Sequence, residues 1–314
     1  MQRDSWDDQI IVEDVYKDIE TRIIASDPTI DRVLKRLFSI RGKGVRPVIT
    51  ALVGKMVGGS WDILRTPAMV VEAVHISSLI HDDVVDESDM RRGETTIHVR
   101  YSEKASVLIG DLIFIKALNI ARTIGEPAAV DVIHHAVERM LEGEMCEELT
   151  DDIIDEDAYL NIIGNKTASL FAAAGELGVI VSGGTGEQRS MARELGESIG
   201  MAFQIIDDTL DIIGDADVMG KPRFADVMSV RFTLPVIHSL GRFGGDEIKK
   251  NFADREAAVS EIADLIIENG GIDYAFDKAR QYSEKARQIV RSLDSGQCGP
   301  EFERFFDLLM TRAS

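Results

Sequence analysis

The chain has 314 residues, 45% of them hydrophobic, and its 55 acidic and 35 basic side chains give a formal net charge of −20. This composition is typical of a folded chain with an ample core, and the charge excludes nucleic acid and anionic membranes as electrostatic partners. Cys146 and Cys298 match neither a metal-binding spacing nor a disulfide framework, and no signal sequence or transmembrane segment is recognisable, so we expect a cytoplasmic protein.

Helical periodicity runs through most of the chain, whereas strand signals are nearly absent. The predicted helices cover residues 7–25, 47–57, 66–87, 103–123, 127–150, 166–181, 187–214 and 271–293. Pro47, Pro67 and Pro127 are expected to start helices, and the apolar circumference of 107–124 predicts burial on all sides. No Pro/Ser-rich linker divides the chain. We therefore expect one all-α domain over 1–314, with a motif-bearing core at about 42–235 and a helical C-terminal region at 241–314.

The first basic cluster, Arg41-Gly42-Lys43-Gly44-Val45-Arg46-Pro47, opens the second predicted helix. Glycines allow close approach of a ligand to the backbone, and a helix N-terminus with Lys and Arg favours phosphate. The next helix carries Glu72 and His75 and ends at Asp82-Asp83-Val84-Val85-Asp86, which Arg91-Arg92-Gly93 follows. His75 and Asp82 lie two helical turns apart on one face, so this histidine is expected to contact a phosphate rather than a metal.

Two segments of the second half repeat this chemistry. Asn165-Lys166-Thr167 opens a helix, and Phe203-Gln204 precedes a second motif, Asp207-Asp208-Thr209-Leu210-Asp211, with Lys221 and Arg231 beyond it. A third match at residues 151–155 lies in an almost continuously acidic run, which predicts a solvated loop or helix end.

The paired Asp-Asp-x-x-Asp motifs indicate a divalent metal and a diphosphate. Residues four apart share a helix face, so Asp82 lies beside Asp86 and Asp207 beside Asp211. Oxygen ligands without Cys or His favour Mg²⁺, which leaves coordination positions for substrate phosphates. The sequence therefore predicts a diphosphate held between two magnesium-loaded helices, at the end of an apolar cavity in a helical bundle.

These motifs, in this order, resemble the polyprenyl synthetase family of trans-isoprenyl diphosphate synthases. The resemblance covers about 42–235 and rests on Gly-Lys-x-x-Arg-Pro, Glu-x-x-His, both Asp motifs, Gly-Asn-Lys-Thr-Ala, Gly-Lys-Pro and Thr-Leu-Pro. It implies the isoprenoid synthase fold, a homodimer, Mg²⁺ as cofactor, and isopentenyl and allylic diphosphates as substrates. Gly44 stands where many members have Arg, although Arg41 is available to compensate, and Arg231 stands where Lys is usual.

The resemblance also implies roles for individual residues. The metal ligands would be Asp82, Asp83, Asp86, Asp207, Asp208 and Asp211. The allylic diphosphate would contact Arg91, Lys166, Gln204, Lys221 and Arg231, and catalysis would rest on Lys166 and Lys221 together with the aspartates. Isopentenyl diphosphate would contact Lys43, Arg46, His75, Arg92 and Phe203.

The residues before Asp82 bear on the length of the product. One helical turn rises about 5.4 Å, roughly one isoprene unit. Short-chain members often carry an aromatic ring at the level where this chain has Ser77 and Ser78. The growing product can therefore pass, with Phe114, Ile115 or Phe171 as a deeper floor, which favours hexaprenyl to octaprenyl products over farnesyl.

Three other readings compete with a long-chain synthase. A geranylgeranyl diphosphate synthase shares all of these motifs. A terpene cyclase needs only one diphosphate site, whereas this chain keeps Lys43, Arg46 and His75 for a second. A non-catalytic subunit of a heteromeric synthase tends to lose the aspartates, and both motifs are intact here.

Overall fold

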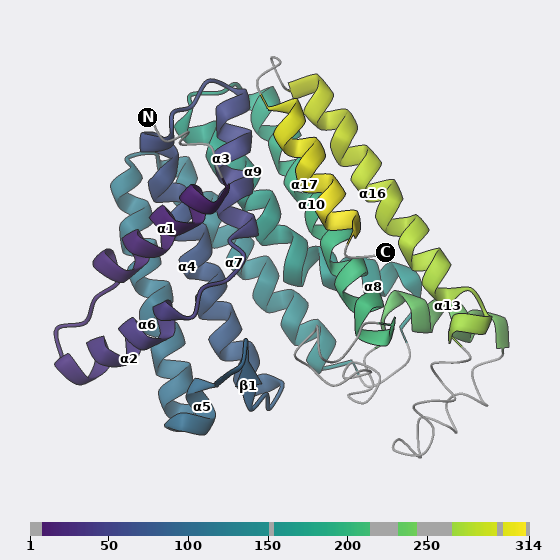
Figure 1. Cartoon of the computed structure of the whole chain (residues 1–314), viewed down its shortest axis with the longest axis horizontal. Coiled ribbons are helices and arrows are strands. Elements are labelled where there is room, and N and C mark those ends of the chain that lie inside the picture. The colour runs from purple at the N-terminus through teal and green to yellow at the C-terminus, as the bar shows by residue number, and fades with distance from the viewer. Residues whose placement is uncertain (1–7, 151–153, 214–231, 244–265, 294–297, 312–314) are drawn as a thin grey trace. The chain divides into compact units, whose positions relative to one another are not determined.

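The computed structural model of the chain describes residues 8–150, 154–213, 232–243, 266–293 and 298–311 (Figure 1). These fall into two compact units that alternate along the sequence. The first comprises Met1–Val137, Leu170–Gly196 and Arg291–Gly299, and the second Glu138–Ser169, Glu197–Val290 and Pro300–Ser314. Because the chain enters each unit several times, the units are not successive segments with a linker between them.

The first unit is built around one long helix. Its helices up to residue 124 are α1 (Asp8–Arg22), α2 (Pro28–Ser39), α3 (Val45–Met56), α4 (Trp61–Val85), α5 (Ile97–Arg100), α6 (Glu103–Ala121) and a 3₁₀ turn (Arg122–Ile124). Helix α4 packs against α1, α3 and α6, and Figure 1 shows α1 and α6 beside it. Val70, Val71 and Ala73 in its middle are fully buried. Helix α4 is long and apolar enough to cross a membrane by composition alone, but the protein uses it as a core helix.

A small hairpin follows α4. Strands β1 (Met90–Arg91) and β2 (Glu94–Thr95) pair antiparallel, with Met90 opposite Thr95 and Arg91 opposite Glu94. The turn residues Arg92 and Gly93 both have positive φ, 52° and 77°, as a two-residue hairpin turn requires. This hairpin was not predicted from the sequence, because Arg-Gly is not the usual Asn-Gly turn signal and each strand has only two residues.

The remaining helices are α7 (Pro127–Glu148), α8 (Glu156–Ile163), a π-helical turn (Gly164–Ala168), α9 (Ser169–Val181), α10 (Gly186–Ile213), α13 (Leu234–Phe243), α16 (Gly271–Leu293) and α17 (Gly299–Thr311). In the second unit, Tyr159 of α8, Ile205 of α10 and Ala275 of α16 belong to one hydrophobic cluster. The cluster includes Ile205 and Ile206, the two residues of α10 directly before the second Asp motif, and so holds that part of the helix in the core.

The all-α prediction is confirmed, and several of its details were wrong. Helices α2 and α8 were missed; each is short and begins at an aspartate cap, Asp27 and Asp155. Pro67 does not start a helix but lies inside α4, where it has no N–H to donate to the carbonyl of Ile63. Asp155, in the third acidic run, caps a helix end as expected, whereas residues 151–153 lie outside the described part.

Helix α6 also differs from the prediction. Residues 107–124 were expected to be buried on all sides, but Val107, Leu108 and Ile115 are 42%, 67% and 53% exposed in the single chain. The helix buries only the face that meets α4, where Ser106, Gly110 and Ile113 lie. Its apolar circumference therefore leaves an exposed apolar strip.

Candidate active site

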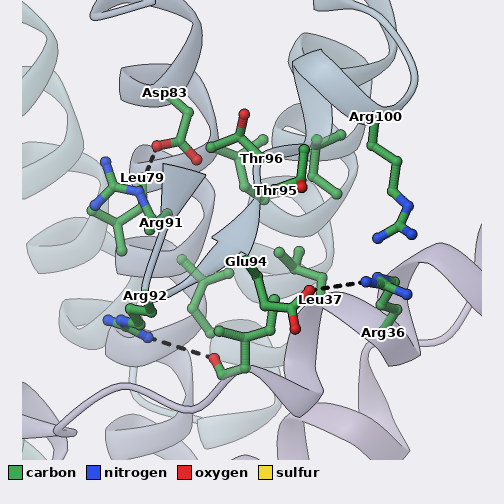
Figure 2. Close-up of a pocket in the computed structure, with 14 residues that line it drawn as sticks. Arg36, Leu37, Leu79, Asp83, Arg91, Arg92, Glu94, Thr95, Thr96 and Arg100 are labelled. Atoms are coloured by element: carbon green, nitrogen blue, oxygen red, sulfur yellow. Dashed lines mark hydrogen bonds and ion pairs between the residues drawn. The ribbon is translucent and has the colours of Figure 1, made fainter. Parts of the chain in front are cut away.

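The first Asp motif closes α4. Asp82 and Asp86 lie four residues apart on one face of the helix end, and Asp86 is its C-terminal cap. Asp83 points about 100° away from Asp82 and about 60° away from Asp86 around the helix. It is 5% exposed and accepts a hydrogen bond from Arg91 Nε at 2.5 Å (Figure 2). Burial raises the pKa of Asp83, and the Arg91 guanidinium opposes that shift. Asp83 is thus held by the hairpin.

The second Asp motif has the same internal arrangement. Its middle residue, Asp208, is buried and accepts hydrogen bonds from Tyr159 Oη on one carboxylate oxygen and Gln204 Nε2 on the other, both at 2.6 Å. Thr167 Oγ1 donates to Gln204 Oε1 at 2.8 Å, which fixes the orientation of that amide. Asp207 and Asp211 share a different face of α10. In both motifs the middle aspartate is bound by neighbouring side chains of the protein.

The two motifs belong to different units, so each is described by itself. Within the described residues, no three His, Cys, Asp or Glu side chains are gathered closely enough to hold a metal ion. The donors of each motif are nonetheless all carboxylate oxygens, which fit a hard divalent cation rather than zinc. Two predicted contacts of the allylic diphosphate, Lys221 and Arg231, lie outside the described residues.

Arg46 is the most unusual cation of the first unit. Its guanidinium lies 4.4 Å from the centre of the buried Phe171 ring, and its Nε is buried without a hydrogen-bond partner among the described residues. Burial lowers the pKa of Arg46 to about 10, while the carboxylates of Glu72 and Asp82 act in the opposite direction. Arg46 as a whole is half-buried, and a guanidinium with an unused buried donor is well suited to an anionic ligand.

The loop before α3 explains the departure at Gly44. Gly44 caps α3 with φ 61° and ψ 33°, in the left-handed region. A Cβ placed there would lie 2.4 Å from a methyl carbon of Val12 on α1. Only glycine therefore fits without strain, and arginine at this position would displace α1. Arg41, which was expected to compensate, is exposed and lies 3.9 Å from Glu20, and Lys43 is exposed.

Two titratable groups lie one helical turn apart on α4, Glu72 buried and His75 half-buried. Burial raises the pKa of Glu72, and the Tyr16 hydrogen bond and the charges of Arg46 and Arg92 oppose that rise. Burial lowers the pKa of His75 well below its ordinary value, and Arg46, Arg92 and Arg91 lower it further. His75 is therefore neutral at physiological pH, and one ring nitrogen is a hydrogen-bond donor without carrying charge.

The shift at His75 gives a prediction about stability. A histidine whose pKa is depressed by folding binds its proton in the unfolded chain first, so stability present above the unfolded pKa of about 6.5 is lost as pH falls through it. We expect His75→Gln to have a shallower loss of unfolding free energy between pH 7.5 and 5.5, by up to about 1.4 kcal/mol per pH unit. Urea denaturation of both proteins across this range measures the difference. Parallel curves would contradict the shifted pKa.

Four arginines surround a small cavity between α2, α4 and the hairpin (Figure 2). Its volume is about 60 Å³, and Leu37, Ile76 and Leu79 are among its apolar lining residues. Two of the arginines are paired across it: Arg36 with Glu94 at 2.9 Å, and Arg91 with Asp83. Arg92 instead donates to the carbonyl oxygen of Ile40 at 3.5 Å. The pairings leave Arg92 as the hairpin cation directed towards the loop before α3.

Lys166 lies on the π-helical turn, a rare geometry that often marks functional sites. Its ammonium group is ion-paired with Glu144 at 2.9 Å and with Glu147, both on α7. Burial lowers the pKa of Lys166, but the carboxylates of Glu147 and Glu144 outweigh burial and raise it overall. Lys166 is therefore a permanent cation. Glu144 and Glu147 were not predicted as partners of Lys166, because in the sequence they belong to an almost continuously acidic run.

The residues predicted to set product length occupy different positions on α4 and α6. Ser77 is buried and donates to the carbonyl oxygen of Gly110 at 2.9 Å, so its hydroxyl faces α6. Ser78, half-buried, lies four residues before Asp82 on the same helix face. Phe114 is half-buried and Ile115 is 53% exposed. Phe203, predicted to contact isopentenyl diphosphate, packs against the hydrophobic cluster of the second unit.

Comparison with known proteins gives a consistent match. Residues 27–268 match the family model described as polyprenyl synthetase. The chain is 32% identical over 263 residues to the octaprenyl diphosphate synthase of Haemophilus influenzae, covering 82% of this chain and 80% of that protein. It is 31% identical over 299 residues to the geranylgeranyl diphosphate synthase of Sulfolobus acidocaldarius, covering 91% of each.

Solved structures agree with the sequence matches. The fold superposes with a TM-score of 0.90 and 29% identity on a polyprenyl synthase from Caulobacter crescentus complexed with calcium and isoprenyl diphosphate, covering 98% of this chain and 96% of that one. A decaprenyl diphosphate synthase from Rhodobacter capsulatus gives a TM-score of 0.89 at 28% identity, with 98% of each chain covered.

Proposed function

Because this chain belongs to the polyprenyl synthetase family, we propose that it joins isopentenyl diphosphate to an allylic diphosphate and makes a polyprenyl diphosphate longer than farnesyl diphosphate. The observation that carries the proposal is the family match over 27–268 with both Asp motifs and Arg46 retained. Relatives with octaprenyl and geranylgeranyl products support a product beyond farnesyl.

The decisive assay uses purified protein, farnesyl diphosphate and labelled isopentenyl diphosphate. Extended prenyl chains in the products are the expected result. Incorporation that stops at the geranylgeranyl length would identify the shorter synthase, and release of a cyclic hydrocarbon would identify a cyclase. No incorporation by the protein alone, with a second subunit restoring it, would identify a non-catalytic subunit.

The aspartates divide into two roles in this proposal. The outer residues, Asp82 and Asp86 in one motif and Asp207 and Asp211 in the other, would hold Mg²⁺. Bound Mg²⁺ would neutralise the diphosphate as negative charge develops on the leaving group. The middle residues hold other side chains: Asp83 orients Arg91, and Asp208 orients Gln204. This assignment refines the prediction that all six are metal ligands.

The chain's cations bind and orient the two diphosphates. Lys166 and the oriented Arg91 hold the allylic diphosphate, whose C–O bond breaks to leave an allylic cation. Arg46, Lys43 and Arg92 hold isopentenyl diphosphate, with neutral His75 as a further donor. The terminal alkene carbon of isopentenyl diphosphate forms the new C–C bond to the allylic cation, which leaves a tertiary cation on the other alkene carbon. The CH2 group next to that carbon then loses a proton to the departing diphosphate, which restores a double bond.

Water must be excluded while the cation exists. The middle of α4 provides this environment, because Val70, Val71, Ala73 and Val74 are at most 2% exposed. The same helix would line the growing chain, and Ser78 is the position on the Asp82 face one turn before the motif. A serine there leaves room for the product to extend.

Product length tests this argument directly. We expect Ser78→Phe to shorten the main product by several isoprene units, because the ring would fill the space one turn below Asp82. Chromatography of the dephosphorylated products measures the change. Ser77→Ala, on the face that meets α6, serves as control and should leave the length distribution unchanged. An unaltered distribution in Ser78→Phe would remove Ser78 from the channel.

We further propose a homodimer that works in the cytoplasm. The exposed apolar strip of α6, defined by Val107, Leu108 and Ile115, is the surface that a second copy would cover. Leu108→Glu with Ile115→Glu is expected to give a monomer in light scattering, because two charges would be buried in the interface. Ile63→Glu on α4, also exposed, should remain dimeric. A double variant that stays dimeric would exclude this strip as the interface.

A further inference from the structure

One buried tyrosine of α1 connects three parts of the first unit. Tyr16 is fully buried, and its hydroxyl donates to Glu72 Oε1 on α4 at 2.9 Å. The same hydroxyl accepts the backbone N–H of Gly42 at 2.6 Å. Gly42 lies in the loop Ile40–Gly44, between α2 and α3 and next to Lys43. The tyrosine thus fixes a backbone position in the middle of that loop.

Helix α1 contacts the same loop at a second point. Val12 is four residues before Tyr16, so the two side chains share one face of α1. Its methyl carbon occupies the place that a side chain at Gly44 would take, 2.4 Å from the position of a Cβ. Tyr16 and Val12 therefore constrain Gly42 and Gly44, the residues on either side of Lys43.

The hairpin contacts the same loop through the side chain of Arg92. A Cβ on Gly42 would lie 2.6 to 2.9 Å from the guanidinium atoms of Arg92, so the guanidinium lies against the bare Cα. Arg92 also donates to the Ile40 carbonyl oxygen at 3.5 Å, the dashed line at the foot of Figure 2. Fixing Gly42 thereby fixes the surface on which Arg92 rests, and Arg46 follows two residues after Gly44.

We propose that Tyr16 is a positioning residue for isopentenyl diphosphate, acting through the loop Ile40–Gly44 to set Lys43, Arg46 and Arg92 in place. The inference rests on the proposed function, because it assigns these cations to that substrate. Tyr16 touches none of the reacting atoms. Its effect should appear in the affinity for one of the two diphosphates and not in the affinity for the other.

A purely structural role for Tyr16 is weakened by the other bonds that hold α1. Trp61 Nε1 donates to Asp14 at 2.9 Å, and Arg65 forms a two-pronged ion pair with Asp18 at 2.5 and 2.8 Å. These bonds already attach α1 to α4 without involving the loop. The Tyr16 hydroxyl connects α1 to the loop backbone by a hydrogen bond. Removing this hydroxyl takes a hydrogen-bond acceptor from the Gly42 N–H and a donor from Glu72.

Tyr16→Phe removes one oxygen and is the direct test. Leaving a buried N–H without its partner is expected to raise the KM and the calorimetric Kd for isopentenyl diphosphate about tenfold. The KM for farnesyl diphosphate and the kcat should stay within about twofold of wild type, since the Tyr16 hydroxyl bonds to Glu72 and Gly42. The two-substrate comparison is the readout that a change in core stability alone would not produce.

The matched control is Trp61→Phe, which removes a hydrogen bond of α1 that does not reach the loop. It should lower the Tm while leaving the affinity for isopentenyl diphosphate unchanged. If Tyr16→Phe folds poorly, Val12→Ala at the half-buried second contact point tests the same loop and should raise the same KM.

The outcomes separate the inference from the proposed function. An active wild type in which Tyr16→Phe and Val12→Ala bind isopentenyl diphosphate normally overturns the positioning role alone. A wild type that neither binds isopentenyl diphosphate nor extends farnesyl diphosphate overturns the site assignment and the inference with it. Selective weakening in both α1 variants, with Trp61→Phe unaffected, supports the inference.

Discussion

Asp82→Asn is expected to lower kcat for the condensation by about a thousandfold or more, because a metal-bound carboxylate stabilises charge that develops only as the leaving group departs. The substitution keeps the size of the side chain and removes its charge. Asp62→Asn, an exposed aspartate in the first turn of the same helix, is the control and should retain wild-type activity. The measurement is the steady-state rate with both diphosphates at saturation.

The same experiment tests whether the two Asp motifs act as one site. If both hold metal against one diphosphate, Asp207→Asn should cost a similar factor, and the double variant should be scarcely slower than either single variant. Independent sites would instead give multiplied losses, a millionfold in all on this scale. Multiplied losses would contradict a single ionising centre.

The parts of this site that were predictable are those that depend on spacing within one helix. The pairs Asp82 with Asp86 and Asp207 with Asp211 follow from helical periodicity alone. So does the apolar character of α4 before the first motif, and the ordered basic clusters supplied the family resemblance. The long periodic helices α4, α6, α7 and α10 were all expected, because several turns of apolar residues outweigh errors at their ends.

The parts that were not predictable depend on partners distant in sequence. Tyr159 lies 49 positions from Asp208, and Tyr16 lies 56 from Glu72, so no local pattern links them. The middle aspartates were indistinguishable from their neighbours until Arg91 and Gln204 were seen to bind them. Gly44 was taken as a weakness of the site, whereas its left-handed backbone and the packing of Val12 require glycine.

Short helices and strands were not predictable for a related reason. The hairpin at Met90–Thr95 and helix α8 contain too few residues to show a period, and tertiary contacts stabilise them. The hairpin matters for function because it aims Arg91 at Asp83 and Arg92 at the loop Ile40–Gly44. The Arg-Arg-Gly sequence after an acidic helix end predicts two positive charges, but it does not predict where the two arginine side chains point.

Arg46→Met is expected to raise the KM for isopentenyl diphosphate about a hundredfold, since it removes a half-buried, charged donor from the proposed diphosphate site. Arg46→Lys should give a smaller increase, because lysine keeps the charge but loses the flat contact with Phe171 and the forked donor geometry. The KM for the allylic substrate should change little in either variant. Initial rates over a matrix of both substrate concentrations measure these effects.

Stability distinguishes ligand binding from a role of Arg46 in the core. The guanidinium carries a desolvation cost that lowers its pKa to about 10, and its Nε has no hydrogen-bond partner among the described residues. Replacing it with an apolar side chain removes that cost but also takes a compensating positive charge from buried Glu72, which keeps the Tyr16 hydrogen bond and the charge of Arg92. The Tm of Arg46→Met should therefore change by less than the Tm of a core truncation. Leu52→Ala, a core truncation on the same helix, should lower the Tm and preserve the KM. If Arg46→Met instead behaved like Leu52→Ala, the guanidinium would be a packing element, and a different cation would have to bind isopentenyl diphosphate.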